Sequence, residues 1–164
     1  MCAILKHKVP PEVLAQWEGD LVKFGARVSP SGDILRLGRS AERNPPRLVQ
    51  FNSWGRRTDE ILVDEGWNTL KDISAEEGLI AIGYERKYGP WSRLYQYLKL
   101  YLFSSSSAIF NCPLAMTDGA ARLLEVYGHT VKSQQHKEIL RNAYHHLTSR
   151  DPKHFWTSGQ WMTE

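Results

Sequence analysis

Histidine and cysteine side chains are the first candidates for chemistry, because they bind metals, carry protons and act as nucleophiles. The chain contains six histidines and two cysteines. His145 and His146 are adjacent, so on a helix they diverge by about 100°. No two histidines have the i, i+4 spacing of a helical metal site, and Cys2 and Cys112 match no zinc pattern. The spacing therefore favours surface or packing histidines over a metal site.

Two nucleophile candidates lack the setting that would activate them. Ser158 precedes Gly159 and Cys112 precedes Pro113, but neither lies between two glycines in a strand-turn-helix elbow. The sequence also contains no glycine-rich phosphate cradle of the GxGxxG or GxxxxGK type. We therefore predict no catalytic residue and no self-contained nucleotide site.

Four arginines form the one basic pattern. Arg36, Arg39, Arg43 and Arg47 lie three to four residues apart, which on a helix gives a ridge that could meet phosphate. Glu42 interrupts this ridge, and the net charge is only +3. A solvent-exposed helix face without a binding role is the favoured interpretation.

Small residues give the segment 112–125 an unusual surface. Ala115, Gly119, Ala120 and Ala121 leave little side-chain bulk along one helix, so something flat or close lies against it. A neighbouring helix and a bound ring system both fit this spacing. Sequence alone does not separate them.

The elements that position these residues follow from hydrophobic periodicity. Apolar residues recur at helical spacing from Val13 to Val28 after a proline pair, and a short helix is predicted over 31–43 before Pro45. Residues 48–63 alternate around Gly55 and predict a small hairpin. The other predicted helices begin near Asp64, after Gly89-Pro90, near Pro113, and before Ile139, Ala143 and Leu147, three residues expected to face inward. The fold class is mainly α.

Composition bounds the remaining possibilities. At 164 residues, with 41% hydrophobic and 24% charged positions, the chain fits one globular domain. The N-terminal apolar run is too short for a secretory signal, and no apolar stretch approaches the roughly 20 residues of a membrane span. The two distant cysteines indicate a reducing compartment. We expect a cytoplasmic protein without a membrane segment.

Residues 112–124, CPLAMTDGAARLL, resemble the helix near the flavin in AidB-like acyl-CoA dehydrogenases. Three other blocks resemble the same family and occur in the same order along the chain. They are residues 37–39 together with 44–46, residues 55–57 together with 59–60, and residues 134–137, which follow Gly128. Residues 162–164 resemble the start of the superfamily's flavin-binding strand. The sequence is thus similar to the N-terminal part of this family from about residue 12 onward.

The resemblance implies a fold and its boundaries. Residues 1–157 would be the N-terminal helical domain of the acyl-CoA dehydrogenase fold, with one small β-hairpin. Residues 158–164 would be the first strand of a middle β-domain, at whose start the chain is truncated. The tail side chains Phe155, Trp156, Trp161 and Met162 are expected to lack cover.

The resemblance also implies site residues. Gln160, Met162 and Thr163 would contact the flavin of FAD, and Leu114, Met116 and Thr117 would line the substrate. The catalytic carboxylate would belong to the missing C-terminal part, so no catalytic residue is assigned.

The implied function is the N-terminal module of an FAD-dependent flavoprotein that oxidises the α,β bond of acyl-CoA thioesters, inactive as this fragment. The alternative is a non-catalytic protein that binds acyl chains or other proteins. The parent would bind acyl-CoA and form a homo-oligomer. DNA binding, which the resemblance places in the absent C-terminal bundle, is the least supported partner.

Overall fold

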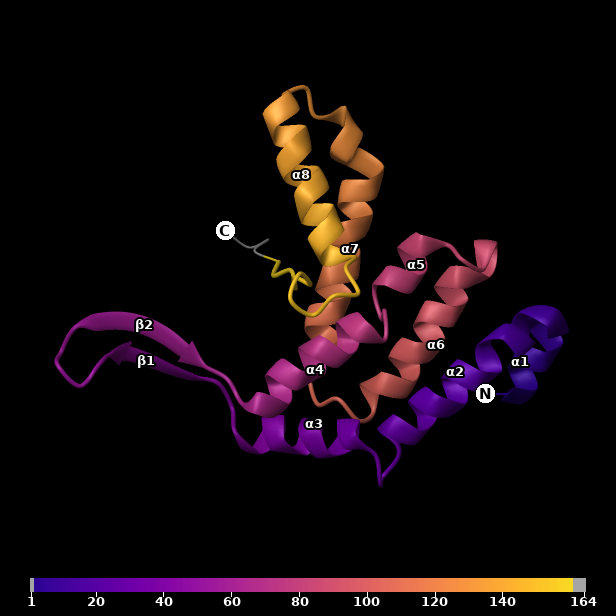
Figure 1. The fold of residues 1–164 in the computed structure, drawn as a ribbon, viewed down its shortest axis with the longest axis horizontal. Coiled ribbons are helices and arrows are strands. Elements are labelled where there is room, and N and C mark those ends of the chain that lie inside the picture. Colours follow the sequence, from indigo (N-terminus) through magenta and orange to yellow (C-terminus); the bar gives the residue numbers. More distant parts are fainter. Residues whose placement is uncertain (1, 161–164) are drawn as a thin grey trace.

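The computed structural model describes the backbone of residues 2–160 and the side chains from residue 5 onward. It is helical, with one antiparallel hairpin (Figure 1), which confirms the predicted fold class. The elements in order are α1 (Cys2–Lys8), α2 (Pro11–Val28), α3 (Asp33–Arg43), β1 (Arg47–Phe51), β2 (Arg57–Leu62), α4 (Glu65–Glu76), α5 (Ala81–Glu85), η1 (Gly89–Trp91), α6 (Ser92–Ser104), α7 (Asn111–Tyr127), η2 (Gly128–Thr130) and α8 (Gln134–Leu147).

Local signals explain several of these boundaries. Pro11 opens α2, where a missing amide proton costs nothing because the first amides of a helix have no partner. Asp64 caps α4, and its carboxylate accepts a hydrogen bond from the Gly66 amide at 2.8 Å. Ser133 caps α8 in the same way. The predicted helix starts near residues 11 and 64 are therefore confirmed.

The helical body has two apolar clusters. The larger one gathers α2, α3, α4, α6, α7 and α8 around fully buried side chains such as Phe24, Leu70 and Phe103. The smaller one joins α1, α2, α5 and α6 around Trp17, which stacks on Tyr95 with ring centroids 5.1 Å apart. The two clusters hold the long helices in place relative to one another.

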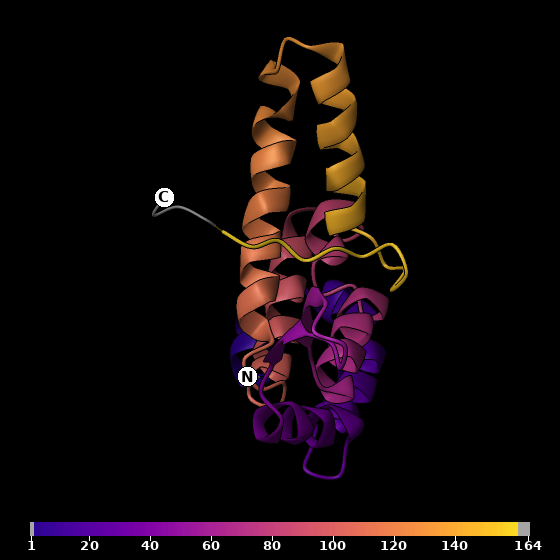
Figure 2. The ribbon, with the colours of Figure 1, turned by 90° about the vertical axis from the view of Figure 1, so that its left-hand side faces the viewer.

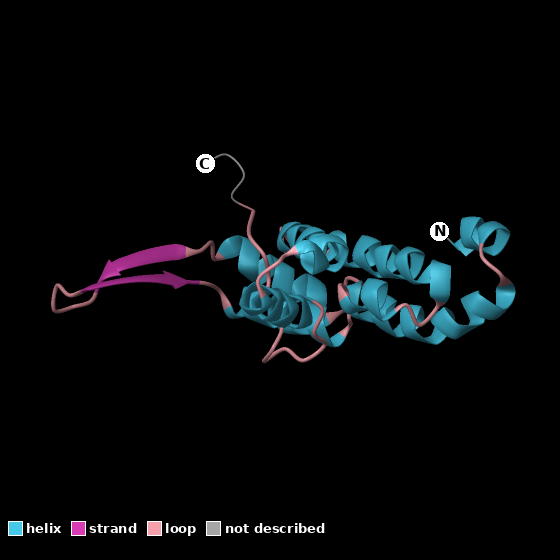
Figure 3. Ribbon diagram, turned by 90° about the horizontal axis from the view of Figure 1, so that it is seen from above, coloured by secondary structure: helices cyan, strands magenta, loops and turns pink. Residues whose placement is uncertain are grey.

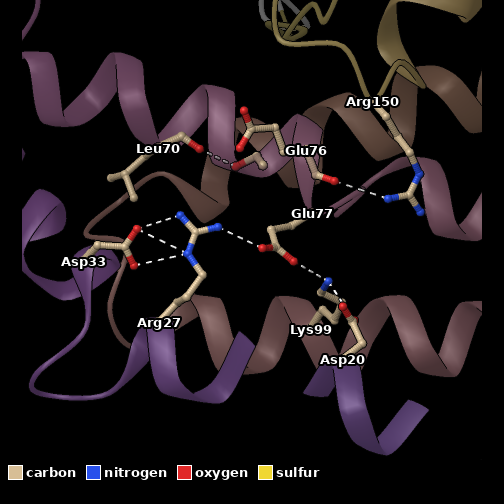
Figure 4. Close-up of polar contacts among 9 residues, drawn as sticks. Asp20, Arg27, Asp33, Leu70, Glu76, Glu77, Lys99 and Arg150 are labelled. Carbon is tan, nitrogen blue, oxygen red and sulfur yellow. Dashed lines mark hydrogen bonds and ion pairs between the residues drawn. The ribbon is translucent and has the colours of Figure 1, made fainter. Parts of the chain in front are cut away.

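A chain of buried and half-buried charges ties four of these helices together (Figure 4). Lys99 on α6 is only 3% exposed and pairs with Glu77 at 2.7 Å and with Asp20 of α2 at 3.0 Å. Arg27 joins the other oxygen of Glu77 at 2.8 Å and pairs with Asp33 at 2.6 Å. Each charge is matched, which offsets the cost of removing it from water.

The hairpin stands away from the helical body (Figures 1 and 3). Every residue of β2 is exposed, and β1 has one half-buried residue, Val49. A register shift between Val49 and Phe51 bends the ladder. The hairpin was predicted at the right place, yet it packs on nothing in the described part of the chain.

Helices α7 and α8 pair along one another and extend beyond the body (Figure 2). Two predictions for this region are wrong. Ile139 was expected to face inward but is 57% exposed, whereas Leu147 is 6% exposed as predicted and Ala143 is half-buried; Leu140 and Tyr144 are half-buried as well. Phe155 does not lack cover, because it is 3% exposed in the larger cluster.

Candidate functional site

The chain's own C-terminal segment crosses the outer face of α7 (Figure 2). The Ser158 amide donates to the Thr117 hydroxyl at 3.0 Å, and that hydroxyl donates to the Pro113 carbonyl at 2.7 Å. Further along, Gln160 reaches Gly119, where an added Cβ would lie 3.6 Å from its Nε2 atom. Two parts of the chain that were expected to contact substrate and cofactor thus meet on one surface.

The structure places the predicted substrate-lining residues at different depths. Leu114 is fully buried within the larger apolar cluster, beneath the surface of α7. Thr117 is also fully buried, under the crossing segment. Met116 is half-buried.

Of the predicted cofactor residues, Gln160 is exposed beside Gly119. Met162 and Thr163 lie outside the described residues, as does Trp161. Trp156 is half-exposed at 48%, and its indole stacks on the His146 ring with centroids 4.0 Å apart.

The small-residue surface of α7 is covered in part by residues 158–160, and among the residues that the structure describes no helix lies over Gly119. Ala121 faces the core, whereas Ala115 and Gly119 remain exposed. An added Cβ at Gly119 would make only ordinary van der Waals contact with Gln160, so the crossing segment lies beside Gly119 without crowding it. A surface of backbone and small side chains is left open beside the segment.

A second set of contacts anchors the segment before it reaches α7. Phe155 is buried, and its amide donates to the Asp151 carbonyl at 2.8 Å. His146 Nδ1 lies 2.6 Å from the His154 carbonyl oxygen, so this nitrogen carries the proton and donates. The segment is therefore fixed at both ends of the described stretch 155–158.

A buried polar network holds α7 against α5 and α6. Asp118 accepts from Arg93 at 2.6 Å and from Gln96 at 3.2 Å, while its carbonyl accepts from the Tyr84 hydroxyl at 2.6 Å. Gln96 is fully buried and also donates to the Leu79 carbonyl at 2.9 Å. Because every member has a partner, the network fixes the rotation of α7 and hence which residues it exposes.

The electrostatics of this network keep its groups in single protonation states. Desolvation, aided by the nearby Asp118 carboxylate, raises the pKa of Tyr84 well above its ordinary value, so the phenol remains a donor. Burial lowers the pKa of Arg93, but its contacts with Tyr84 and Asp118 outweigh that effect and the net direction is upward. Neither group is poised to exchange a proton near neutral pH.

Sequence reasoning missed this network. Asp118 is a carboxylate in a helix rich in small and apolar residues, and Arg93 and Gln96 occupy the first turns of a helix rich in leucine and tyrosine. Polar residues at helix positions that face the core are the signal that could have identified the network, because buried polar side chains require hydrogen-bond partners.

Beside this surface, α6 and α7 enclose a hollow of about 460 Å³. Its walls include Tyr97, Leu100 and Tyr101 from α6 and Ala115 from α7. The size is within the range of small-molecule sites. It opens on the side of α7 from which the exposed Ala115 projects.

Across the described part of the chain, no three His, Cys, Asp or Glu side chains gather in a way that could hold a metal ion. None of the helices described there combines the length and apolar character needed to cross a bilayer.

Comparison with known proteins gives concordant results. Residues 3–161 match the family described as Adaptive response protein AidB N-terminal domain. The chain is 43% identical to Acyl-CoA dehydrogenase family member 11 of Caenorhabditis elegans, over 98% of this chain and 25% of that protein. It is 26% identical to Putative acyl-CoA dehydrogenase AidB of Escherichia coli (strain K12), over 67% of this chain and 20% of that protein.

Two solved structures share the fold. Caenorhabditis elegans ACDH-11, crystallised in complex with C11-CoA, superposes with a TM-score of 0.88 at 41% identity, over 99% of this chain and 26% of that one. The apo form of Bd2924 gives 0.84 at 47% identity, over 98% and 30%. The chain therefore spans between a fifth and a third of the length of these relatives.

Proposed function

Because this chain belongs to the AidB N-terminal domain family and is the N-terminal domain of an acyl-CoA dehydrogenase family member, we propose that it supplies one wall of a flavin site. At that site the α,β bond of an acyl-CoA thioester would be oxidised. Residues 158–164 would begin the flavin-binding strand that completes the wall.

The contact between Ser158 and Thr117 carries this proposal. It lays the segment that holds Gln160 across α7 and leaves Gly119 open beside it. A flat ring needs a surface with little side-chain bulk on one side and hydrogen-bonding groups at its edge. The exposed backbone and small residues here meet the first requirement.

The groups present also fit the polar edge of a flavin. The backbone amides of Gly159 and Gln160 make no hydrogen bond with any residue that the structure describes, so they are available as donors. In the proposed site these amides, the Gln160 side chain, Met162 and the Thr163 hydroxyl hold that edge. FAD, when bound, would accept the hydride from the substrate.

For the substrate side, we assign the acyl group to the half-exposed surface at Met116, which borders the buried Thr117 and the segment that covers it. Leu114 would act from beneath, by filling the core under that surface. The complex of ACDH-11 with C11-CoA supports an acyl-CoA as the ligand class, since that protein shares 41% identity with this chain.

The carboxylates of α7 are unsuited to remove the α-proton. Asp118 is held by Arg93 at 2.6 Å, and Glu125 lies 2.5 Å from both Arg86 and Arg122. A base must be free to face the reacting carbon. We therefore propose that the base comes from a part of the protein beyond this domain.

The experiment is a flavin titration of the 164-residue chain. One wall with a few hydrogen bonds, each contributing about 1 kcal/mol, falls short of the roughly 8 kcal/mol of a micromolar complex. The purified chain should show no flavin absorbance, no saturable FAD binding and no acyl-CoA-dependent dye reduction. A stoichiometric yellow protein that turns over would refute the one-wall proposal.

The exposed hairpin favours the second candidate, a protein-interaction module. Leu48, Phe51 and Ile61 are each more than half exposed, and Trp54 is 89% exposed. Apolar side chains in this number on a projecting arm are typical of contact surfaces. Sedimentation velocity over a range of concentrations would support self-association through the arm if a Trp54→Ser variant sediments as a smaller species.

A further inference from the structure

Side chains from the outer ends of α7 and α8 line a groove. Figure 1 shows these helix ends toward the tip of the pair. The volume of the groove is about 470 Å³. The lining side chains fall into an apolar group, Leu124, Leu140 and Tyr144, and a basic group, His129, Lys137 and Arg141.

The basic group is unusual because its side chains have no partner among the residues that the structure describes. Among the residues that the structure describes, His129, Lys137 and Arg141 form no ion pair and no side-chain hydrogen bond. The acidic residue at the groove, Glu125, is already engaged by Arg86 and Arg122, at 2.5 Å each. The charge left for a ligand is therefore positive.

The contacts of Glu125 also keep its carboxylate from competing with a ligand for the basic side chains of the groove. Burial raises its pKa, but the hydrogen bonds from Arg122 and Arg86 outweigh burial and hold the value below the ordinary one. Its negative charge is thus matched by two guanidinium groups at all moderate pH. An anion entering the groove faces the unpaired cations rather than a free carboxylate.

The apolar group forms a floor. Leu124 and Tyr144 are half-buried and pack against the edge of the larger cluster. Leu140 is also half-buried and lines the groove beside them. Burial, with the negative Glu125 nearby, raises the pKa of Tyr144, so its phenol stays neutral and able to donate. An alkyl chain lying on this floor would be removed from water, which favours its binding.

We propose that this groove binds a small anionic amphiphile, with its head group at Lys137 and Arg141 and its alkyl chain along Leu124 and Leu140. Guanidinium and ammonium groups match a carboxylate or phosphate head, and the volume lies within the range of ligand pockets. The site is separate from the wall formed by Thr117 and the crossing segment, so it does not depend on the proposed flavin chemistry.

Calorimetric titration of the full 164-residue chain with decanoate tests the site. Acetate supplies the head without the chain, and decanol supplies the chain without the head. Decanoate should bind at least about tenfold more tightly than either, since both halves of the groove are used. Equal binding of decanol, or no binding of decanoate, would overturn the proposal.

Two variants locate the binding. The double substitution Lys137→Glu with Arg141→Glu should weaken decanoate binding at least about tenfold, whereas Arg36→Glu with Arg43→Glu on α3, with the same change of charge, should not. Gly128→Leu fills the groove without altering charge, because an added Cβ there meets nothing within 4 Å, and it should also abolish binding. Undiminished affinity in folded Gly128→Leu protein would place the ligand elsewhere and reject this groove.

Discussion

The Thr117 hydroxyl accepts the Ser158 amide and donates to the Pro113 carbonyl, so one buried oxygen joins a helix to a segment 41 residues away. Leaving a buried donor without a partner costs about 1–3 kcal/mol. We expect Thr117→Val to lower the free energy of unfolding by about 1–2 kcal/mol and to speed hydrogen exchange at Ser158. Urea unfolding and exchange measured by NMR would check both effects.

Thr130→Val provides the matched control. Its hydroxyl donates only to the Tyr127 carbonyl, at an exposed position, so its loss should change stability by no more than about 0.5 kcal/mol. Equal effects of the two substitutions would show that the Thr117 contact has no special role in holding the segment.

Asp20 makes stability depend on acid pH. Desolvation raises its pKa, but hydrogen bonds from Tyr95 and Lys99 outweigh it, and the folded value lies below the ordinary 3.8. A lowered pKa adds stability above pH 3.8, and this contribution is lost as the pH falls through the folded value. Asp20→Asn should therefore be less stable than the parent near neutrality, with the difference shrinking below pH 3.8.

Chemical unfolding at about pH 7 and about pH 2 measures this difference. Asp72→Asn is the control, because Asp72 makes only a surface pair with Lys71 at 3.6 Å. A difference between Asp20→Asn and the parent that stays constant across this range would contradict the assignment.

Among the elements, the hairpin contributes least to the helical body. Its side chains are exposed and its strands contact mainly one another. Replacing residues 47–62 with a short Gly-Ser linker should leave the helical circular dichroism signal and cooperative melting in place. Loss of cooperativity would mean that the hairpin stabilises the body.

The core gives the comparison for that experiment. Trp17 is fully buried and stacks on Tyr95, so Trp17→Ala should cost about 3–5 kcal/mol. The melting temperature of the Trp17→Ala variant should fall far below that of the hairpin-deletion variant.

Long periodic elements were predictable from sequence, and short or tertiary features were not. The stripes from Val13 to Val28 and from Trp67 to Ile73 became α2 and α4, because amphipathic periodicity over several turns leaves one face to bury. The five-residue helix α5 was missed, since it is too short for a period and follows Gly78, whose φ of +63° breaks the chain direction.

The site was only partly predictable for a related reason. The residue types on α7 and in the tail predicted that both contribute to a ligand-binding surface. The contact between Thr117 and Ser158 could not be predicted, because it is long-range and has no local sequence pattern. Burial of Phe155 likewise depends on where helices pack, and hydrophobic side chains in a tail carry no signal that distinguishes cover from exposure. The predicted contacts of Gln160 with flavin remain predictions.

At the scale of the whole molecule, the domain presents an open surface on α7, a projecting hairpin and a cationic groove, all on a body fixed by two apolar clusters. It spans about a quarter of Acyl-CoA dehydrogenase family member 11. If α7 supplies one wall of a flavin site as proposed, further elements must cover that wall, because tight cofactor sites enclose most of their ligand.

The most direct test is a chimera in which this chain replaces the corresponding N-terminal quarter of the Caenorhabditis elegans relative, to which it is 43% identical. If the chain supplies one wall of a flavin site, the purified chimera should carry about one FAD per subunit and reduce dye with an acyl-CoA. Gly119→Leu should lower both, because its side chain would occupy the exposed wall. A folded chimera without bound FAD, or one whose flavin content and turnover are indifferent to Gly119→Leu, would contradict the account.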